Sequence, residues 1–98
     1  MAFTLSDVQD EVSLLPPSDY KVVLYNDDYT TKDFVIYVLR TVFHKTVTEA
    51  IQTMELVHKR GRGVAGVYSY DIAMTRRQMT INLARSEGFP LRCELEEN

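Results

Sequence analysis

The chain has 98 residues, a formal net charge of −3 at pH 7 and a single cysteine, Cys93. This length suits one small domain, and a lone cysteine without a Cys/His cluster excludes an internal disulfide and a zinc site, which favours the reducing cytoplasm. No apolar stretch approaches the length of a membrane span and no basic excess marks a nucleic-acid-binding protein, so we expect neither kind of partner.

The first 19 residues differ in composition from the rest of the chain. They carry four acids and no base, so residues 20–98 hold 11 bases and 10 acids. The segment has no sustained period of two or 3.6 and ends in Pro16-Pro17, which is incompatible with a helix there. We interpret residues 1–19 as a flexible N-terminal tail and residues 20–98 as the folded domain.

The folded domain is expected to begin with a strand followed by a helix. Residues 20–25 are β-branched and aromatic and stop abruptly at Asn26-Asp27-Asp28, which predicts a strand. Thr30 and Asp33 then resemble a capping box in front of an apolar stripe of helical period, which predicts a helix over 31–44.

A second capping box opens the next helix. Thr46 and Glu49 have the required spacing, and Gly61 is a typical helix stop. The expected inward stripe of this helix consists of Val47, Ala50, Ile51, Met54, Val57 and His58.

The last third of the chain reads as strand, helix and strand. A strand is expected over 64–70, with Gly66 as a bulge or a close backbone approach. Asp71 can begin a helix whose sparse apolar face is Ile72, Met79 and Leu83. The final strand alternates Leu91, Cys93 and Leu95, which places Cys93 in the core and leaves one face of the sheet wet.

These elements follow the order β-α-α-β-α-β. Three strands and three helices that must cover one face make an α+β fold, a two-layer sandwich on a three-stranded antiparallel sheet.

The densest polar group lies between the first strand and the first helix, at Asn26-Asp27-Asp28-Tyr29-Thr30. A turn and a helix cap would account for one Asn or Asp. Three in a row near the positive end of a helix could also hold a cation, either a metal ion or an ammonium group.

His58 lies one turn after Met54, so we expect its imidazole to be part-buried beside apolar neighbours. A lone histidine in such a place is usually structural. If the first two helices pack together, however, Val35, Met54 and Val57 lie beside an Asn, two Asp and a His. That combination suits a small ligand with one positive end and one apolar end.

Together these residues resemble the ClpS adaptors of the bacterial N-end rule pathway. The resemblance covers most of residues 20–97. It rests on Asn26-Asp27-Asp28-Tyr29-Thr30 after a strand, on Met54, Val57 and His58 in a helix, and on Pro90-Leu91 with Cys93 in the last strand.

The resemblance implies a function and its residues. Such an adaptor binds proteins whose first residue is Phe, Tyr, Trp or Leu and delivers them to the N-terminal domain of the AAA+ unfoldase ClpA, which is coupled to the ClpP peptidase. It would be a monomer with no cofactor and no enzymatic activity. The family pattern assigns the free α-amino group to Asn26, Asp28 and His58, with Asp27 supporting the loop. It assigns the first side chain to a pocket of Thr30, Val35, Met54, Val57 and Leu91.

Two motifs depart from the family pattern. Thr31-Lys32 stand where the family usually has Pro-Met, so Lys32 replaces an apolar group at the side-chain pocket. The third helix retains Asp71, Thr75 and Arg76 of the unfoldase-docking motif but has Met74 where the family has a glutamate.

Two other functions remain open. Asp27, Asp28 and His58 could form the site of a small metal-dependent hydrolase. The architecture is also similar to the C-terminal domain of the ribosomal stalk protein, an interaction domain that would not need the Asn-Asp-Asp loop.

Overall fold

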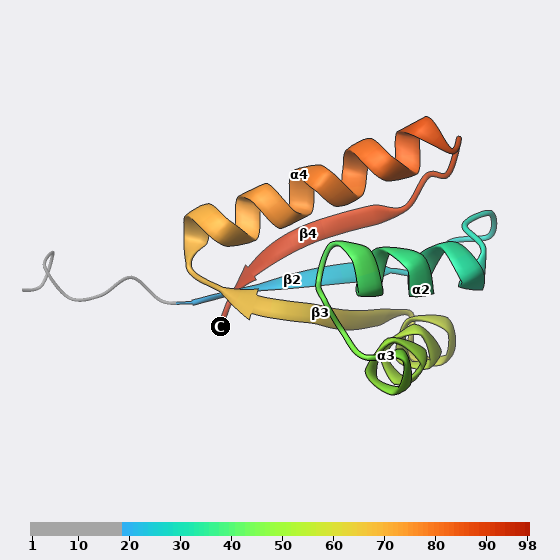
Figure 1. Cartoon of the computed structure of the whole chain (residues 1–98), viewed down its shortest axis with the longest axis horizontal. Coiled ribbons are helices and arrows are strands. Elements are labelled where there is room, and N and C mark those ends of the chain that lie inside the picture. Colours follow the sequence, from blue (N-terminus) through green and yellow to red (C-terminus); the bar gives the residue numbers. More distant parts are fainter. Residues whose placement is uncertain (1–18) are drawn as a thin grey trace, which may run out of the picture.

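The structure, a computed structural model, describes residues 19–98 and has its elements in the predicted order (Figure 1). The predicted tail therefore lies, except for Asp19, outside the described residues. The elements are β2 (Tyr20–Tyr25), α2 (Lys32–Thr41), α3 (Val47–Arg60), β3 (Arg62–Tyr68), α4 (Tyr70–Ser86) and β4 (Arg92–Glu97).

The three strands form one antiparallel sheet in the order β3-β2-β4, with β2 in the centre. Val22 pairs with Leu95 and Leu24 with Cys93, so these side chains share one face of the sheet. Val22 and Leu24 belong to a single core cluster with side chains of α2, α3 and α4. All three helices therefore cover the same face, and the predicted two-layer α+β fold is confirmed.

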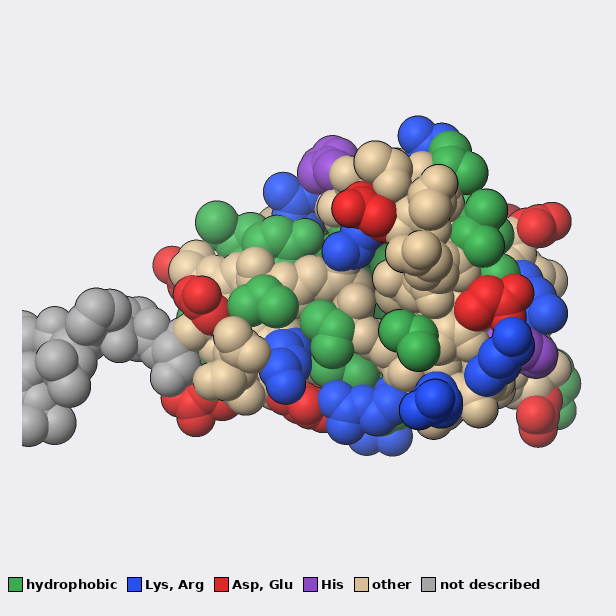
Figure 2. Space-filling view, turned by 90° about the horizontal axis from the view of Figure 1, so that it is seen from below, with side chains coloured by type: hydrophobic (Ala, Val, Ile, Leu, Met, Phe, Trp, Pro, Cys, Tyr) green, Lys and Arg blue, Asp and Glu red, His purple; other side chains and the backbone are tan. Residues whose placement is uncertain are grey.

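The opposite face of the sheet combines charged side chains with three valines: Val23, which is fully buried, and Val64 and Val67, which are 37% and 44% exposed. Lys21 pairs with Glu96 and Tyr25 with Arg92, while Arg62 Nη2 lies 2.7 Å from Glu96 Oε1. Seen from below, Lys and Arg side chains gather along the lower edge of the view, and hydrophobic side chains form separate small patches above them (Figure 2). One face of the sheet is thus wet, as the alternation in the last strand predicts.

The strand β3 contains the predicted bulge. Val22 pairs with Gly66 but Val23 pairs with Val64, so Ala65 has no partner in the register. The ring of Tyr68 occupies the space that a Cβ on Gly66 would need. The strand itself begins two residues earlier than expected, at Arg62.

The helix α2 is capped one residue later than predicted. Thr31, not Thr30, is the N-cap, and its Oγ1 accepts a hydrogen bond of 3.1 Å from Phe34 N–H. Thr30 instead donates its hydroxyl to Asp27. The helix also ends earlier, at Thr41, because His44 has a left-handed φ of 56° that a continuing helix does not allow.

The helix α3 has both signals that the sequence predicts. Thr46 and Glu49 exchange the two hydrogen bonds of a capping box, at 3.1 and 2.9 Å. Gly61 ends the helix with φ of 89°. The inward face is rotated, however, because Val47 and Ile51 are 48% and 42% exposed. The buried positions are Ala50, Thr53, Met54 and Val57.

The predicted apolar face of α4 is wrong at two of its three residues, because only Leu83 is partly buried against the core. Ile72 and Met79 are 47% and 40% exposed. The buried residues are Ala73, Thr80 and Ala84, which are small enough to let the helix lie close to the sheet. Arg77 Nε accordingly reaches the backbone carbonyl of Cys93, at 2.8 Å.

Cys93 is buried, as predicted, at 1% exposure. Burial raises the pKa of its thiol to about 12, so the group is a neutral core side chain at neutral pH. Among the helices of the described part, none is long and apolar enough to cross a membrane.

Gly61 and Gly88 make a matched pair for testing the left-handed helix ends. Both have positive φ, 89° and 76°, and nothing lies within 4 Å of an added Cβ. Any cost of Gly61→Ala therefore comes from the backbone, and the free energy of unfolding should fall by about 1 kcal/mol. Urea unfolding followed by circular dichroism measures this.

Gly88→Ala should cost about the same, and Gly61→Asn should cost less because Asn tolerates the left-handed region. Equal stability of the Gly61→Ala and Gly61→Asn proteins would contradict this account.

Candidate functional site

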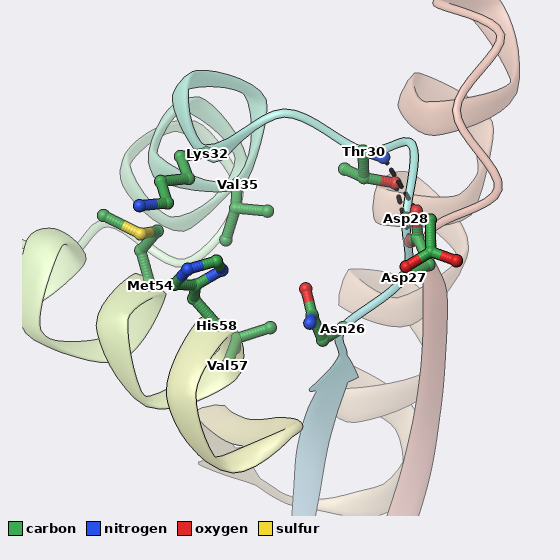
Figure 3. A pocket seen from close by; sticks show the side chains of 9 residues that line it. All are labelled: Asn26, Asp27, Asp28, Thr30, Lys32, Val35, Met54, Val57 and His58. Atoms are coloured by element: carbon green, nitrogen blue, oxygen red, sulfur yellow. Dashed lines mark hydrogen bonds between the residues drawn. The ribbon is translucent and has the colours of Figure 1, made fainter.

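A cavity of about 310 Å³ opens where the loop after β2 faces α2 and α3 (Figure 3). Its lining comprises nine of the ten residues that the resemblance to the family assigns to binding an amino group and a first side chain. They are Asn26, Asp27, Asp28, Thr30, Lys32, Val35, Met54, Val57 and His58.

Asp27 holds the loop together rather than facing a ligand. Its Oδ1 accepts hydrogen bonds from the backbone N–H groups of Tyr29 and Thr30, at 2.8 and 2.7 Å, and its Oδ2 accepts the Thr30 hydroxyl, at 2.7 Å. Partial burial disfavours the charged form, but these bonds outweigh it and lower the pKa of Asp27 below 3.8. The carboxylate is therefore ionised at neutral pH and its acceptor capacity is largely used.

A backbone hydrogen bond joins the loop to α3. Asn26 N–H donates to the carbonyl of Gly61, at 2.9 Å, and Gly61 N–H in turn donates to the carbonyl of Val57, at 3.0 Å. The end of α3 that carries Val57 and His58 is thus fixed against the start of the loop. Nothing in the sequence pattern indicated this contact, because Asn26 and Gly61 are far apart along the chain.

The polar groups of the cavity are Asn26 and Asp28 on the loop and His58 on α3, across the opening beside Met54 (Figure 3). All three are exposed, and within residues 19–98 no hydrogen bond occupies their side chains. His58 was expected to be part-buried. It is exposed because it follows the buried Val57 in the last turn of α3, at the rim of the cavity. An amide oxygen, a carboxylate and an imidazole nitrogen are all hydrogen-bond acceptors.

The apolar side of the cavity comes from the two helices. Val35 of α2 and Met54 and Val57 of α3 are only 5%, 6% and 3% exposed. Lys32, the first residue of α2, is exposed, and Figure 3 shows its side chain beside Met54, across the opening from the loop. The cavity therefore has an acceptor-rich side, formed by Asn26 and Asp28 with His58 facing them across the opening, and an apolar wall from the two helices with Lys32 at its edge.

Leu91 is the one predicted pocket residue that the structure places elsewhere. It is buried, but it lines a second cavity, of about 290 Å³, with residues of α4 and β4. The sheet order explains the separation. The helix α3 packs on β3 at one edge, while Leu91 leads into β4 at the other edge.

The predicted docking residues lie in the first two turns of α4. Asp71 and Thr75 are exposed, and the Thr75 hydroxyl donates to the backbone carbonyl of Asp71, at 3.0 Å. Arg76 is engaged within the chain. Its guanidinium donates to the carbonyl of Val42, at 2.6 Å, and lies 5.7 Å from the ring centre of Tyr68.

The metal site that a hydrolase would need is not formed. Within residues 19–98, no three His, Cys, Asp or Glu side chains are grouped so that they could hold a metal ion. Asp27 is already used by the loop, and Figure 3 shows Asp27 and His58 on different sides of the opening.

The sequence matches a protein-family model over most of its length. Residues 15–94 match the model described as ATP-dependent Clp protease adaptor protein ClpS. A relative from Nautilia profundicola, named ATP-dependent Clp protease adapter protein ClpS, is 48% identical over 94 residues, which are 96% of this chain and 97% of that protein. A relative of the same name from Syntrophus aciditrophicus is 44% identical over 93% of this chain and 85% of its own length.

A solved structure gives the same result for the fold. The structure of Agrobacterium tumefaciens ClpS2 bound to L-phenylalaninamide matches with a TM-score of 0.80 and 38% identity, over 84% of this chain and 99% of that one. The chain therefore belongs to the ClpS family of Clp protease adaptor proteins, and it is an adaptor rather than an enzyme.

Proposed function

We propose that this adaptor binds the free N-terminus of proteins that begin with Phe, Tyr, Trp or Leu and delivers them to a ClpA-type unfoldase in the cytoplasm. The observation that carries the proposal is the two-sided cavity, in which free acceptors lie beside a buried apolar wall. The ligand named for the structural relative, L-phenylalaninamide, has both matching parts, an α-amino group and an aromatic side chain.

The α-amino group matches the acceptor-rich side. Near neutral pH it is largely an ammonium group with three N–H donors. Asn26 Oδ1, the carboxylate of Asp28 and an imidazole nitrogen of His58 supply three acceptors. We propose that each takes one of these donors.

We expect internal peptides to bind poorly because they have no charged α-amino group. A backbone amide in mid-chain carries one N–H and no charge. It would cover Asp28 without pairing it, and leaving a covered charge unpaired costs about 1 to 3 kcal/mol or more. The same reasoning applies to an acetylated N-terminus.

For delivery, Asp71 and Thr75 offer an exposed face at the start of α4. Arg76 is less available, since Val42 and Tyr68 already engage its guanidinium. We therefore propose that docking on the unfoldase depends more on Asp71 and Thr75 than on Arg76.

The amino-group site is tested with a peptide panel that varies only the first residue and its acetylation. Asp28→Asn should weaken binding of a Phe-initiated peptide about tenfold, because the ammonium loses its only free carboxylate partner. N-acetylation should nearly abolish binding. Isothermal titration gives both dissociation constants.

Asp33→Asn is the matched control, since it removes one exposed acid from the first turn of α2 outside the cavity. Its effect on affinity should be small. Free and acetylated peptides that bind equally well would refute the proposed function.

The role of Asp27 as a loop support is tested separately. Asp27→Asn should lower the free energy of unfolding by about 1 kcal/mol, because an amide cannot accept all three hydrogen bonds. The pKa of Asp27 is lowered in the folded state, so its contribution is present above the unfolded pKa and is lost as pH falls through the lower folded value.

The backbone amide signals of Tyr29 and Thr30 should accordingly titrate in NMR spectra with a midpoint below 3.8. A midpoint above that value would show that burial outweighs the hydrogen bonds.

Lys32 should set the ranking among first residues. Its methylene groups can lie along the cavity rim beside Met54 while the ammonium reaches water. Lys32→Met should change the relative affinities for Phe, Tyr, Trp and Leu by about 1 kcal/mol and leave the need for a free amino group unchanged. Identical rankings for the two proteins in a four-peptide panel would exclude Lys32 from the site.

A further inference from the structure

A second cavity of about 290 Å³ lies between the C-terminal half of α4 and the segment that leads into β4. It shares no lining residue with the first cavity. We call it the arginine cavity, because Arg77, Arg85 and Arg92 line it and Glu94 is its only acid.

The arginines reach the cavity from two sides. Arg77, Ile81 and Arg85 follow one another at intervals of four residues, so they share one face of α4. Arg92 begins β4. The guanidinium of Arg77 is fixed in place by its 2.8 Å hydrogen bond to the carbonyl of Cys93.

The positive charge of this cavity is only partly compensated. Glu94 lies 3.5 Å from Arg77 Nη2 and 3.4 Å from Arg92 Nε, both long for a charged hydrogen bond. Arg85 is exposed and has no ion-pair partner within the described residues. Three guanidinium groups thus line the cavity with one carboxylate. Arg77 is engaged by the carbonyl of Cys93 and Arg92 lies 4.2 Å from the ring centre of Tyr25, so the free donors for another acceptor come mainly from Arg85.

The floor of the cavity is apolar and firmly packed. Ala84 and Leu91 are 1% and 6% exposed. Phe89 is partly buried, and its ring centre lies 5.0 Å from that of Phe34 in the core. A ligand that offers only an anion would leave this floor unused.

We propose that the arginine cavity binds a peptide segment in which an Asp or Glu side chain stands next to an apolar one. A carboxylate matches the planar fork of a guanidinium. One negative charge suits the partial compensation by Glu94, whereas a phosphate dianion would be repelled both by Glu94 and by the negative C-terminal end of α4. The apolar neighbour then covers the floor formed by Ala84, Phe89 and Leu91.

The test uses the full chain labelled with ¹⁵N and the peptide acetyl-Glu-Leu-Asp-Leu-amide. Acetylation removes the α-amino group that the first cavity is proposed to require, so the two proposals fail independently. Titration should shift the amide signals of Ile81, Leu91 and Cys93 with saturation. The matched peptide acetyl-Gln-Leu-Asn-Leu-amide should bind at least about fivefold more weakly.

Arg85→Gln should also weaken binding of the acidic peptide about fivefold. The substitution should not disturb folding, because Arg85 is exposed and makes no ion pair in the described part. Arg40→Gln, which removes an exposed arginine from the last turn of α2, is the control of equal charge change and should leave the affinity unchanged.

Four results would overturn the proposal. They are equal binding of the acidic and amide peptides, an unchanged affinity in Arg85→Gln, shifts confined to residues 26–35, and inorganic phosphate binding as tightly as the peptide.

Discussion

The binding cavity depends on one backbone hydrogen bond, from Asn26 N–H to the carbonyl of Gly61. Gly61 ends α3 in a left-handed conformation and sends the chain directly into β3, whose first residue, Arg62, pairs with Tyr25. The loop after β2 and the end of α3 are thereby placed by the same few residues. Because the loop carries Asn26 and Asp28 and the end of α3 carries Val57 and His58, this bond holds these two parts of the cavity against each other.

Two adjacent carboxylates have different roles in this loop because their surroundings differ. Asp27 is partly buried and accepts three short hydrogen bonds, so it is satisfied before any ligand arrives. Asp28 is exposed and remains hydrated in the free protein. A ligand that displaces this water must replace it with a charged donor. The proposed selectivity for a free N-terminus would thus depend on the first carboxylate being occupied and the second being left open.

Local signals made part of this molecule predictable. The strand over 20–25, the capping box at Thr46 and the stop at Gly61 each depend on neighbours within a few residues, and all three are confirmed. The inward face of α4 and the place of Leu91 depend instead on how closely a helix approaches the sheet and on the order of the strands. Hydrophobicity favoured Ile72 for the core, but close packing selected Ala73, because only a small side chain fits there.

The sheet order also keeps the two cavities apart. The helix α3 packs on β3 at one edge of the sheet, and α4 packs on β4 at the other edge. The central strand β2 pairs with both of these edge strands. Val22 and Leu24 of this strand are fully buried in the shared core, and the two cavities have no lining residue in common. Substitutions at the two rims should therefore act additively. If both proposals hold, the adaptor would bind two ligands at opposite edges of one sheet through sites that have no residue in common.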